Sequence, residues 1–170
     1  MKVTLADVLE ARDRRQEKRL ALAREFGLPV VVFTVNMPGE EKSNEISDYI
    51  FEAGVEAISR RLFDKIVSLS VVDAPTGNEA FFVTDASDAS ELKRETCSVE
   101  EEHFLGRLFD IDVYDGEGRQ ICRSELGLSE RKCLLCERDA RQCARSRAHP
   151  LDELLEKIAR MKEEYELLYD

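Results

Sequence analysis

Asp110 and Asp112 are the residues whose type and spacing most clearly indicate chemistry. They lie in the segment 106–114, where apolar and polar side chains alternate from Phe109 onward, so we expect a β-strand there. Side chains two residues apart on a strand project from the same face, roughly 6.5–7 Å apart. Two carboxylates at this spacing can share Mg²⁺, which takes oxygen ligands and bridges to substrate phosphates. With the neighbouring Arg107 they indicate metal-assisted phosphoryl or nucleotidyl transfer, and two solvated acids at a strand end are the alternative.

The loop 38–44 is a candidate phosphate-binding segment. It joins an expected buried strand, 29–35, to a helix that we expect Ser43 or Asn44 to cap. Free backbone N–H groups and the positive dipole end of a helix N-terminus suit an anion, and Lys42 adds a cation. The glycine and lysine spacing of a P-loop is absent, so an ordinary strand–helix turn is the alternative.

A cluster of cysteines near the end of the chain has the spacing of a metal site. Its four candidate ligands are Cys133, Cys136, Cys143 and His149. A Cys-x2-Cys pair can bind one side of a tetrahedral zinc ion, and the later cysteine and histidine can complete it. Four protein ligands leave no open position, so such a zinc would be structural. The alternative is a set of reduced cysteines that pack as small apolar residues, as we expect for Cys97 and Cys122.

The composition of the 170 residues describes one globular domain, 43% hydrophobic and 36% charged. No run is long and apolar enough for a membrane span or a signal peptide, so we expect a cytoplasmic protein that does not bind membranes. The net charge of −11 argues against nucleic-acid binding. Basic residues nevertheless gather at 12–19 and at 131–147, which favours a defined anionic ligand or an acidic partner. His103 could reach the acidic strand as a base, although a helix cap is the alternative.

Hydrophobic periodicity predicts an α+β fold, a single mixed β-sheet covered by helices with a closing C-terminal helix. The expected helices are 5–26, 44–63, 90–102 and 151–168, and the expected strands are 29–35, 65–72, 80–84, 106–114 and 119–123. The turn 115–118 makes the last two strands a hairpin. The Cys/Arg-rich segment 129–149 lies within the same domain, and its periodicity resolves poorly.

Several stretches together resemble the apo-citrate lyase phosphoribosyl-dephospho-CoA transferases, over about residues 5–160. These stretches are Gly106–Val113, Arg131–Glu137, Cys143–Arg145 with His149, Arg12-Asp13 with Arg15-Gln16, and Pro38-Gly39 with Lys42. The Gly-Arg-Leu-x-Asp-Ile-Asp-Val and Cys-Leu-Leu-Cys-Glu strings are specific in combination. Ala11 departs from the small polar residue expected before Arg-Asp.

The resemblance implies a nucleotidyltransferase-like enzyme that joins 2′-(5″-triphosphoribosyl)-3′-dephospho-CoA to a serine of the citrate lyase acyl carrier subunit and releases pyrophosphate. Asp110 and Asp112 would hold Mg²⁺ on the triphosphate. The implied donor-binding residues are Arg107, Gly39, Lys42, Ser43, Arg12 and Arg15. The basic segment 131–147 would face the carrier, which itself brings the nucleophile. Two alternatives stay open, namely the equivalent transferase for malonate decarboxylase and a non-catalytic, zinc-stapled adaptor that binds a carrier protein.

Overall fold

The computed structural model describes all 170 residues and contains one five-stranded sheet in the order β2-β3-β1-β4-β5. The helices are α1 (Leu5–Phe26), α2 (Glu45–Arg61), α3 (Ala89–Glu102), α4 (Ala140–Ser146) and α5 (Leu151–Tyr169), with 3-10 turns η1 (Gly106–Leu108) and η2 (Arg123–Leu126). The strands are β1 (Val30–Val35), β2 (Ile66–Val72), β3 (Glu79–Thr84), β4 (Phe109–Tyr114) and β5 (Gln120–Ile121). The predicted α+β class is confirmed, and the sheet turns out to be antiparallel in every pairing rather than mixed.

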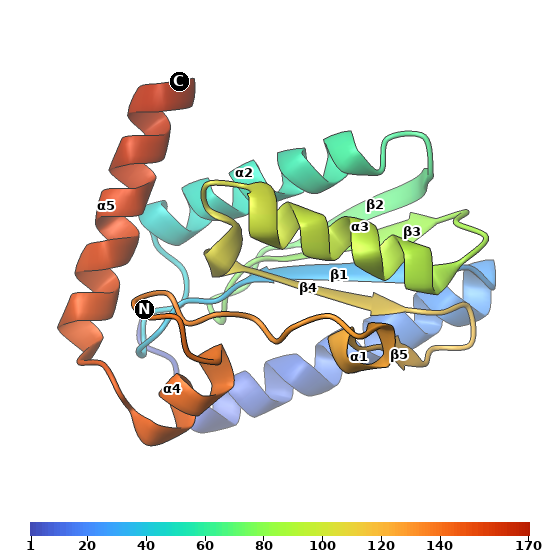
Figure 1. Ribbon diagram of the computed structural model, residues 1–170. Helices are drawn as coiled ribbons and strands as arrows, with labels where there is room; N and C mark the ends of the chain where they lie inside the picture. Colours follow the sequence, from blue (N-terminus) through green and yellow to red (C-terminus); the bar gives the residue numbers. More distant parts are fainter.

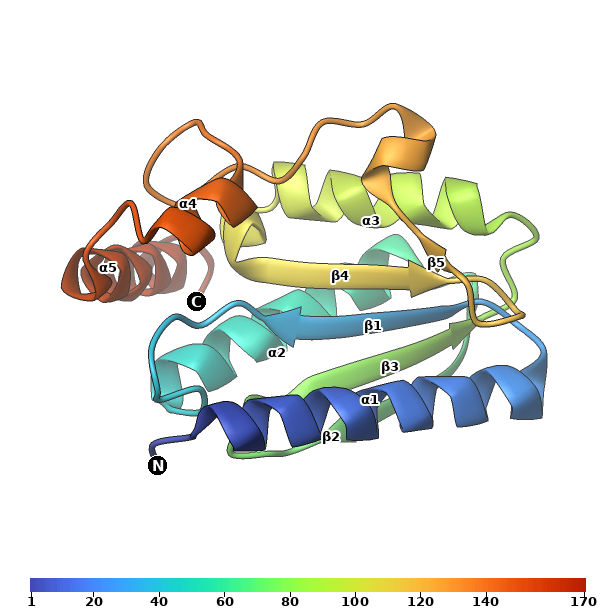
Figure 2. The same cartoon turned by 90° about the horizontal axis from the view of Figure 1, so that it is seen from below.

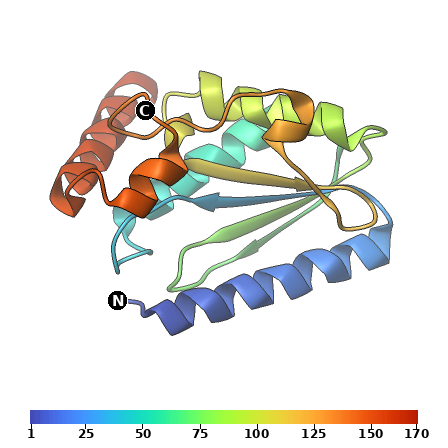
Figure 3. The ribbon, with the colours of Figure 1, turned by 60° about the horizontal axis from the view of Figure 1, so that its bottom comes forward.

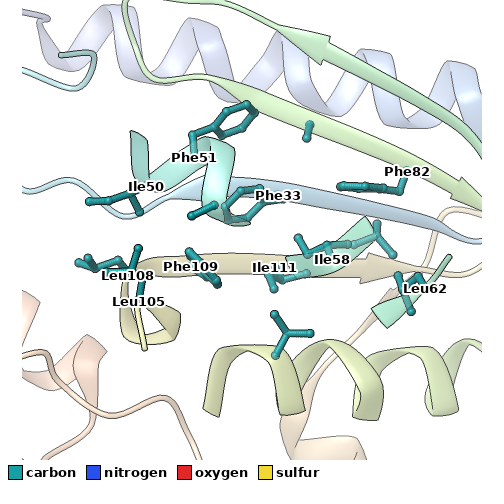
Figure 4. Packing of buried hydrophobic residues seen from close by; sticks show 14 of the residues in the cluster. Phe33, Ile50, Phe51, Ile58, Leu62, Phe82, Leu105, Leu108, Phe109 and Ile111 are labelled. Atoms are coloured by element: carbon teal, nitrogen blue, oxygen red, sulfur yellow. The ribbon is translucent and has the colours of Figure 1, made fainter. Parts of the chain in front are cut away.

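Two helices cover one face of the sheet and one helix lies on the other (Figure 1). α2 and α3 enclose the main core, where Phe33 of β1 stacks on Phe51 of α2 with ring centres 5.4 Å apart (Figure 4). Phe109 of β4 meets the same Phe33 ring edge-on. α1 packs mainly against β1 and β3, over a small cluster of three valines and one phenylalanine, Val30 and Val32 from β1 and Phe81 and Val83 from β3 (Figure 2). β1 is buried on both faces over Val30–Phe33, as its apolar run predicts.

One boundary differs in a way that affects the site. The strand expected from residue 106 begins at Phe109, because Gly106–Leu108 forms the 3-10 turn η1. Gly106 lies so close to the backbone carbonyl of Glu100 that a β-carbon would collide with it. This close approach bends the chain before β4, so Arg107 does not lie on the strand and Leu108 is buried in the core.

The segment 127–150 crosses the end of the sheet where β4 begins, and α5 stands beside it (Figures 1 and 3). Within this segment α4 is short, and an isolated bridge pairs Lys132 with Asp139. α5 buries only Ile158 and Met161 and leaves most of its surface exposed. None of the helices is both long and apolar enough to cross a bilayer.

Candidate active site

Asp110 and Asp112 project from the face of β4 that looks toward α1. The alternation predicted for β4 is confirmed, since every second residue from Phe109 is buried and the two aspartates between them are half-buried. The Asp110 side chain keeps 45% of its surface exposed. Burial, together with the charge of Asp110, raises the pKa of Asp112 from its ordinary 3.8 to about 6. The two carboxylates therefore repel each other, and a cation between them would relieve the repulsion.

The sheet register places a third carboxylate in the same row. Glu79 of β3 pairs with Thr34 of β1, and Thr34 pairs in turn with Asp110. Paired residues lie on one face, so Glu79 and Asp110 are two strand spacings apart, about 10 Å. The Arg15 Nε donates to Glu79 Oε1 at 3.0 Å, which brings one of the predicted donor-binding arginines to this face.

α1 directs further cations toward the same face of the sheet. The Arg19 guanidinium stacks 3.9 Å from the centre of the Tyr114 ring, and Lys18 Nζ lies 5.0 Å from the centre of the Phe81 ring. Arg12 is exposed, and its spacing of three from Arg15 and seven from Arg19 puts it on their side of the helix. A helix with this many cations turned inward buries little apolar surface, and Ala11 and Ala23 are its only buried residues.

Arg131 supplies the cation closest to the aspartates. Its Nη1 lies 3.2 Å from Asp110 Oδ1, and its Nη2 donates to the backbone carbonyl of Phe109 at 2.5 Å. Its Nε is 3.8 Å from Glu100 Oε2. The guanidinium thus closes the outer edge of β4 directly beside the carboxylates.

Buried side chains complete this outer edge, because β5 pairs only with the last two residues of β4. Glu100 of α3 accepts from the Ile111 N–H at 3.0 Å, and Lys93 Nζ donates to the Ile111 carbonyl at 2.8 Å. Arg123 forms an ion pair with Glu100. The backbone N–H and C=O of Ile111, which have no strand partner at this edge, are thus hydrogen-bonded to buried side chains. These hydrogen bonds hold β4 in place between the two aspartates.

The structure does not bring Arg107 to the carboxylate face. Its Nη1 donates to the Cys133 carbonyl at 3.0 Å, and its Nη2 lies 3.3 Å from Glu137. It lines a polar cavity of about 370 Å³ at the edge of β4, together with Arg123, Arg131 and Lys132. Three glutamates, Glu100, Glu101 and Glu130, line it as well. Arg131 also contacts Asp110, so it joins this mixed, predominantly basic cavity to the carboxylates.

His103 lies on the opposite face of the sheet from Asp110. Its ring packs 4.9 Å from that of Phe109 and 5.2 Å from that of Tyr165, beside a cavity of about 780 Å³ between α2, α3 and α5. Its Nδ1 accepts from the Leu105 N–H at 3.0 Å, and burial lowers its pKa. The sheet separates this imidazole from the carboxylates, and it ends α3 as a cap residue.

The loop 36–44 lies at the end of the sheet where Asp110 is found, since the Asn36 N–H donates to the Leu108 carbonyl at 2.8 Å. Lys42 Nζ donates to the Met37 carbonyl at 2.5 Å, and burial lowers the pKa of this ammonium. Asn44 caps α2, so Ser43 precedes the cap. Gly39 has a φ of 83°, in the left-handed region that favours glycine. Both Ser43 and Gly39 are half-buried.

The four candidate zinc ligands converge. The ligand atoms of Cys133, Cys136, Cys143 and His149 all lie within 4.8 Å of one another, and the Sγ atoms of Cys136 and Cys143 are 3.5 Å apart. A tetrahedral zinc with bonds of about 2.3 Å separates its sulfur ligands by about 3.8 Å. His149 Nε2 is buried without a hydrogen-bond partner. Hydrogen bonds from Arg138 lower the pKa of Cys136 to about 6, which favours its thiolate. The cluster can hold a metal ion such as zinc.

The remaining cysteines differ from each other. Cys97 is buried, as expected, whereas Cys122 is exposed. Cys122 precedes η2 and its N–H donates to Glu125, so it lies outside the core. The expectation of a buried thiol at Cys122 is therefore wrong.

Comparison with known proteins agrees with this arrangement. A family model described as apo-citrate lyase phosphoribosyl-dephospho-CoA transferase matches residues 3–165. The chain belongs to this family. A Vibrio cholerae protein named "Probable apo-citrate lyase phosphoribosyl-dephospho-CoA transferase" is 42% identical over 169 residues, which cover 97% of this chain and 94% of the relative. Family members from Escherichia coli and Citrobacter koseri are 38% and 36% identical, over 92% and 90% of this chain and 86% and 85% of their own lengths.

The match to the family spans all the residues described above, including those that sequence reasoning missed. Glu79 and Thr34 were missed because only the register of three strands brings them into line with Asp110. Arg131 was recognised only as part of a basic segment and as the first residue of one stretch that carries the family resemblance. The one sequence signal for a role of Arg131 in the site was its position two residues before Cys133, the first candidate zinc ligand. A bound metal would hold this segment, and Arg131 with it, in a defined conformation.

Proposed function

We propose that the face of β4 that carries Asp110 and Asp112 is where this transferase joins the phosphoribosyl-dephospho-CoA group to the acyl carrier subunit of citrate lyase. The serine oxygen of the carrier attacks the phosphorus nearest the ribose of the triphosphoribosyl donor. A phosphodiester bond forms, the bond to the next phosphate breaks and pyrophosphate leaves, while the serine proton passes to water. The observation that carries this proposal is a pair of half-buried carboxylates on one strand face, with Arg131 against Asp110 and with Arg15 and Arg19 of α1 on the same face of the sheet.

The pair of aspartates fits a divalent cation. Mg²⁺ takes carboxylate oxygens and usually keeps positions open for substrate phosphates. The two carboxylates lie on one strand face. Burial and the charge of Asp110 raise the pKa of Asp112, and a cation bound between the two carboxylates would offset their repulsion. When bound, Mg²⁺ would neutralise negative charge on the triphosphate.

The cations around the carboxylates have a separate role, which is to bind and orient the donor. Arg131 lies between Asp110 and the polar cavity, so its guanidinium can donate hydrogen bonds to a phosphate in place of the Asp110 carboxylate. Arg107 lines the same cavity and can bind phosphate oxygens there. From the other side, Arg12 and Arg15 of α1 and the loop with Gly39, Lys42 and Ser43 would hold the rest of the donor.

We infer that the Cys3His cluster holds a structural zinc ion. Four ligands close the coordination shell, so the ion would take no part in the reaction. The cluster instead fixes the chain that follows Arg131, because the Cys133 N–H donates to the Arg138 carbonyl at 2.8 Å and the Ala140 N–H donates to the Arg131 carbonyl at 2.9 Å. Zinc would therefore keep Arg131 against Asp110.

The carrier would approach through the exposed arginines of the same segment. Arg138, Arg141, Arg145 and Arg147 are exposed and lie beside the beginning of β4. A chain with a net charge of −11 would repel an acidic carrier except at such a basic surface.

The test is pyrophosphate release when the protein is mixed with the triphosphoribosyl donor, Mg²⁺ and the apo-carrier. Asp110→Asn and Asp112→Asn should each lower the rate by at least about a hundredfold without lowering the thermal midpoint. Asp85→Asn, at an exposed carboxylate on a loop, is the matched control and should be unchanged. Wild-type rates in either site variant would exclude the metal-binding role, and carrier binding without any transfer would favour the adaptor.

A further inference from the structure

β2 forms an open edge of the sheet. β3 is its only hydrogen-bonded neighbour, so one side of its backbone has no strand partner. Figure 2 shows β2 as the outermost strand, at the opposite edge from β5. Proteins usually protect such an edge with charged side chains, proline or a short strand. β2 has seven residues, Ile-Val-Ser-Leu-Ser-Val-Val, and none of them is charged or a proline.

The outer side chains of β2 are apolar and exposed. Leu69 and Val71 pair with Phe82 and Ala80 and so lie on the face covered by α2 and α3, but these helices do not reach them. Leu69 is 42% exposed, Val71 52% and Val67 49%. An uncharged open edge with two exposed apolar side chains on one face, Leu69 and Val71, and a third exposed at Val67, is a surface suited to pairing with another strand.

The sequence of this strand and its flanks is complementary to itself when it is reversed. The segment reads Lys65-Ile-Val-Ser-Leu-Ser-Val-Val-Asp73. In an antiparallel pair of two copies centred on Leu69, each Val67 faces a Val71 and each serine faces a serine. At both ends Lys65 of one copy meets Asp73 of the other. Asp73 is exposed and has no ion-pair partner within its own chain. Lys65 Nζ lies 3.4 Å from both Asp64 and Glu95, so in the dimer Asp73 of the second copy would join or replace these partners.

We propose that β2 is the interface of a homodimer, in which a second copy of this chain pairs its β2 antiparallel about a two-fold axis at Leu69. The two five-stranded sheets then form one continuous sheet. Apolar cross-strand pairs supply the affinity, and the two Lys65–Asp73 pairs set the register, because exposed ion pairs add little energy. A second copy fits this edge better than another partner, because the two-fold axis places apolar residues opposite apolar residues and Lys65 of one copy opposite Asp73 of the other.

Two features of the fold agree with this arrangement. The bulge in β2 lies at Val67, between Ile66 and Ser68, so the Leu69–Leu69 and Ser68–Ser70 pairs at the axis fall on the regular part of the strand, whereas the Val67–Val71 pairs include the bulged residue. The carboxylates of β4 are three strands away from β2, on the face toward α1, so both sites stay accessible in the dimer. The dimer is thus independent of the proposed function.

The experiment is sedimentation of the full chain over a range of concentrations. The wild type should dimerise, and Leu69→Lys, which places two ammonium groups opposite each other at the axis, should raise the dissociation constant at least about tenfold. Leu155→Lys on α5 is the matched control, since Leu155 is 39% exposed and should not affect the dimer. The monomeric variant should keep its transfer activity. A wild type that stays monomeric, or a dimer that Leu69→Lys does not weaken, overturns the proposal.

Cross-linking tests the register without depending on how well that variant folds. Leu69→Cys should form a disulfide between two copies under mild oxidation, because residue 69 faces itself. Ser70→Cys should not cross-link with itself but should do so when mixed with Ser68→Cys, and wild type controls for the native thiols. Asp73→Lys should weaken the dimer more than Glu163→Lys, which changes the net charge equally on exposed α5. Equal cross-linking at positions 69 and 70 would contradict the two-fold at Leu69.

Discussion

Replacing Asp112 by asparagine should stabilise the protein while it abolishes transfer. The pKa of Asp112 rises from 3.8 to about 6, first because of burial and then because of Asp110. This rise corresponds to an unfavourable free energy of about 3 kcal/mol for the ionised carboxylate in the folded chain. Asparagine has nearly the same shape, is neutral, and can still accept from Gln120 Nε2, which lies 3.1 Å from Asp112 Oδ1. Without Mg²⁺, the variant should gain about 2–3 kcal/mol above pH 7.

The stability difference between Asp112→Asn and the wild type should depend on pH in a defined direction. Below about pH 3 the carboxyl is protonated in both the folded and the unfolded chain, so this difference between wild type and variant should vanish. Between about pH 4 and pH 6 the unfolded chain loses this proton first, and the wild type loses stability as pH rises. Above about pH 6 the folded carboxyl is ionised as well, and the difference should stay constant.

Urea denaturation of both proteins from pH 4 to pH 8, in EDTA, measures the difference. Asp85→Asn should show no such dependence on pH. Added Mg²⁺ should stabilise the wild type but not Asp112→Asn, since only the wild type keeps both ligands. A variant that is less stable than wild type at pH 8, or a difference that does not change with pH, would refute the account of Asp112 as a carboxylate under electrostatic strain.

Three further predictions concern the surroundings of the carboxylates. Arg131→Met should lower the transfer rate at least about a hundredfold. Lys132→Met should lose much less, because the Lys132 ammonium lines the cavity but pairs with exposed Glu137 rather than with Asp110; equal losses would show that Arg131 acts only through the basic segment. Metal analysis should find about one zinc per chain, lost in Cys133→Ser but kept in Cys122→Ser, and chelation should lower the thermal midpoint; a stable, metal-free wild type would exclude zinc. Reversing Arg141 and Arg145 to glutamate should raise KM for the carrier, less so at high salt, and leave KM for the donor unchanged; the opposite pattern would assign these arginines to the donor.

Local patterns in the sequence were sufficient for several parts of the site. The alternation of β4 predicts that Asp110 and Asp112 share one face, and the spacing of three cysteines and His149 predicts that they can converge on one ion. Both predictions depend on interactions between residues close in the chain. Helix and strand boundaries were also close to the observed ones, because apolar periodicity and capping residues are local signals.

Other parts of the prediction were changed by contacts between distant segments. Arg107 seemed to belong beside the aspartates because it is their neighbour in sequence, but the contact of Gly106 with the Glu100 carbonyl bends the chain into η1 and turns Arg107 toward the cysteine segment. His103 precedes the same strand and yet lies on the other side of the sheet. Neither displacement has a signal in the local sequence, since both result from the packing of α3 against β4.

The sequence by itself determined which two carboxylates stand together, because the two-residue period of a strand is a property of the backbone that no distant contact alters. Only the tertiary structure decided which side chains surround them. Arg131 reaches Asp110 from 21 residues away, and Glu79 reaches the same row through the register of β3, β1 and β4. Register and edge contacts depend on how several elements pack at once, so they are set by the free energy of the whole fold rather than by any segment alone.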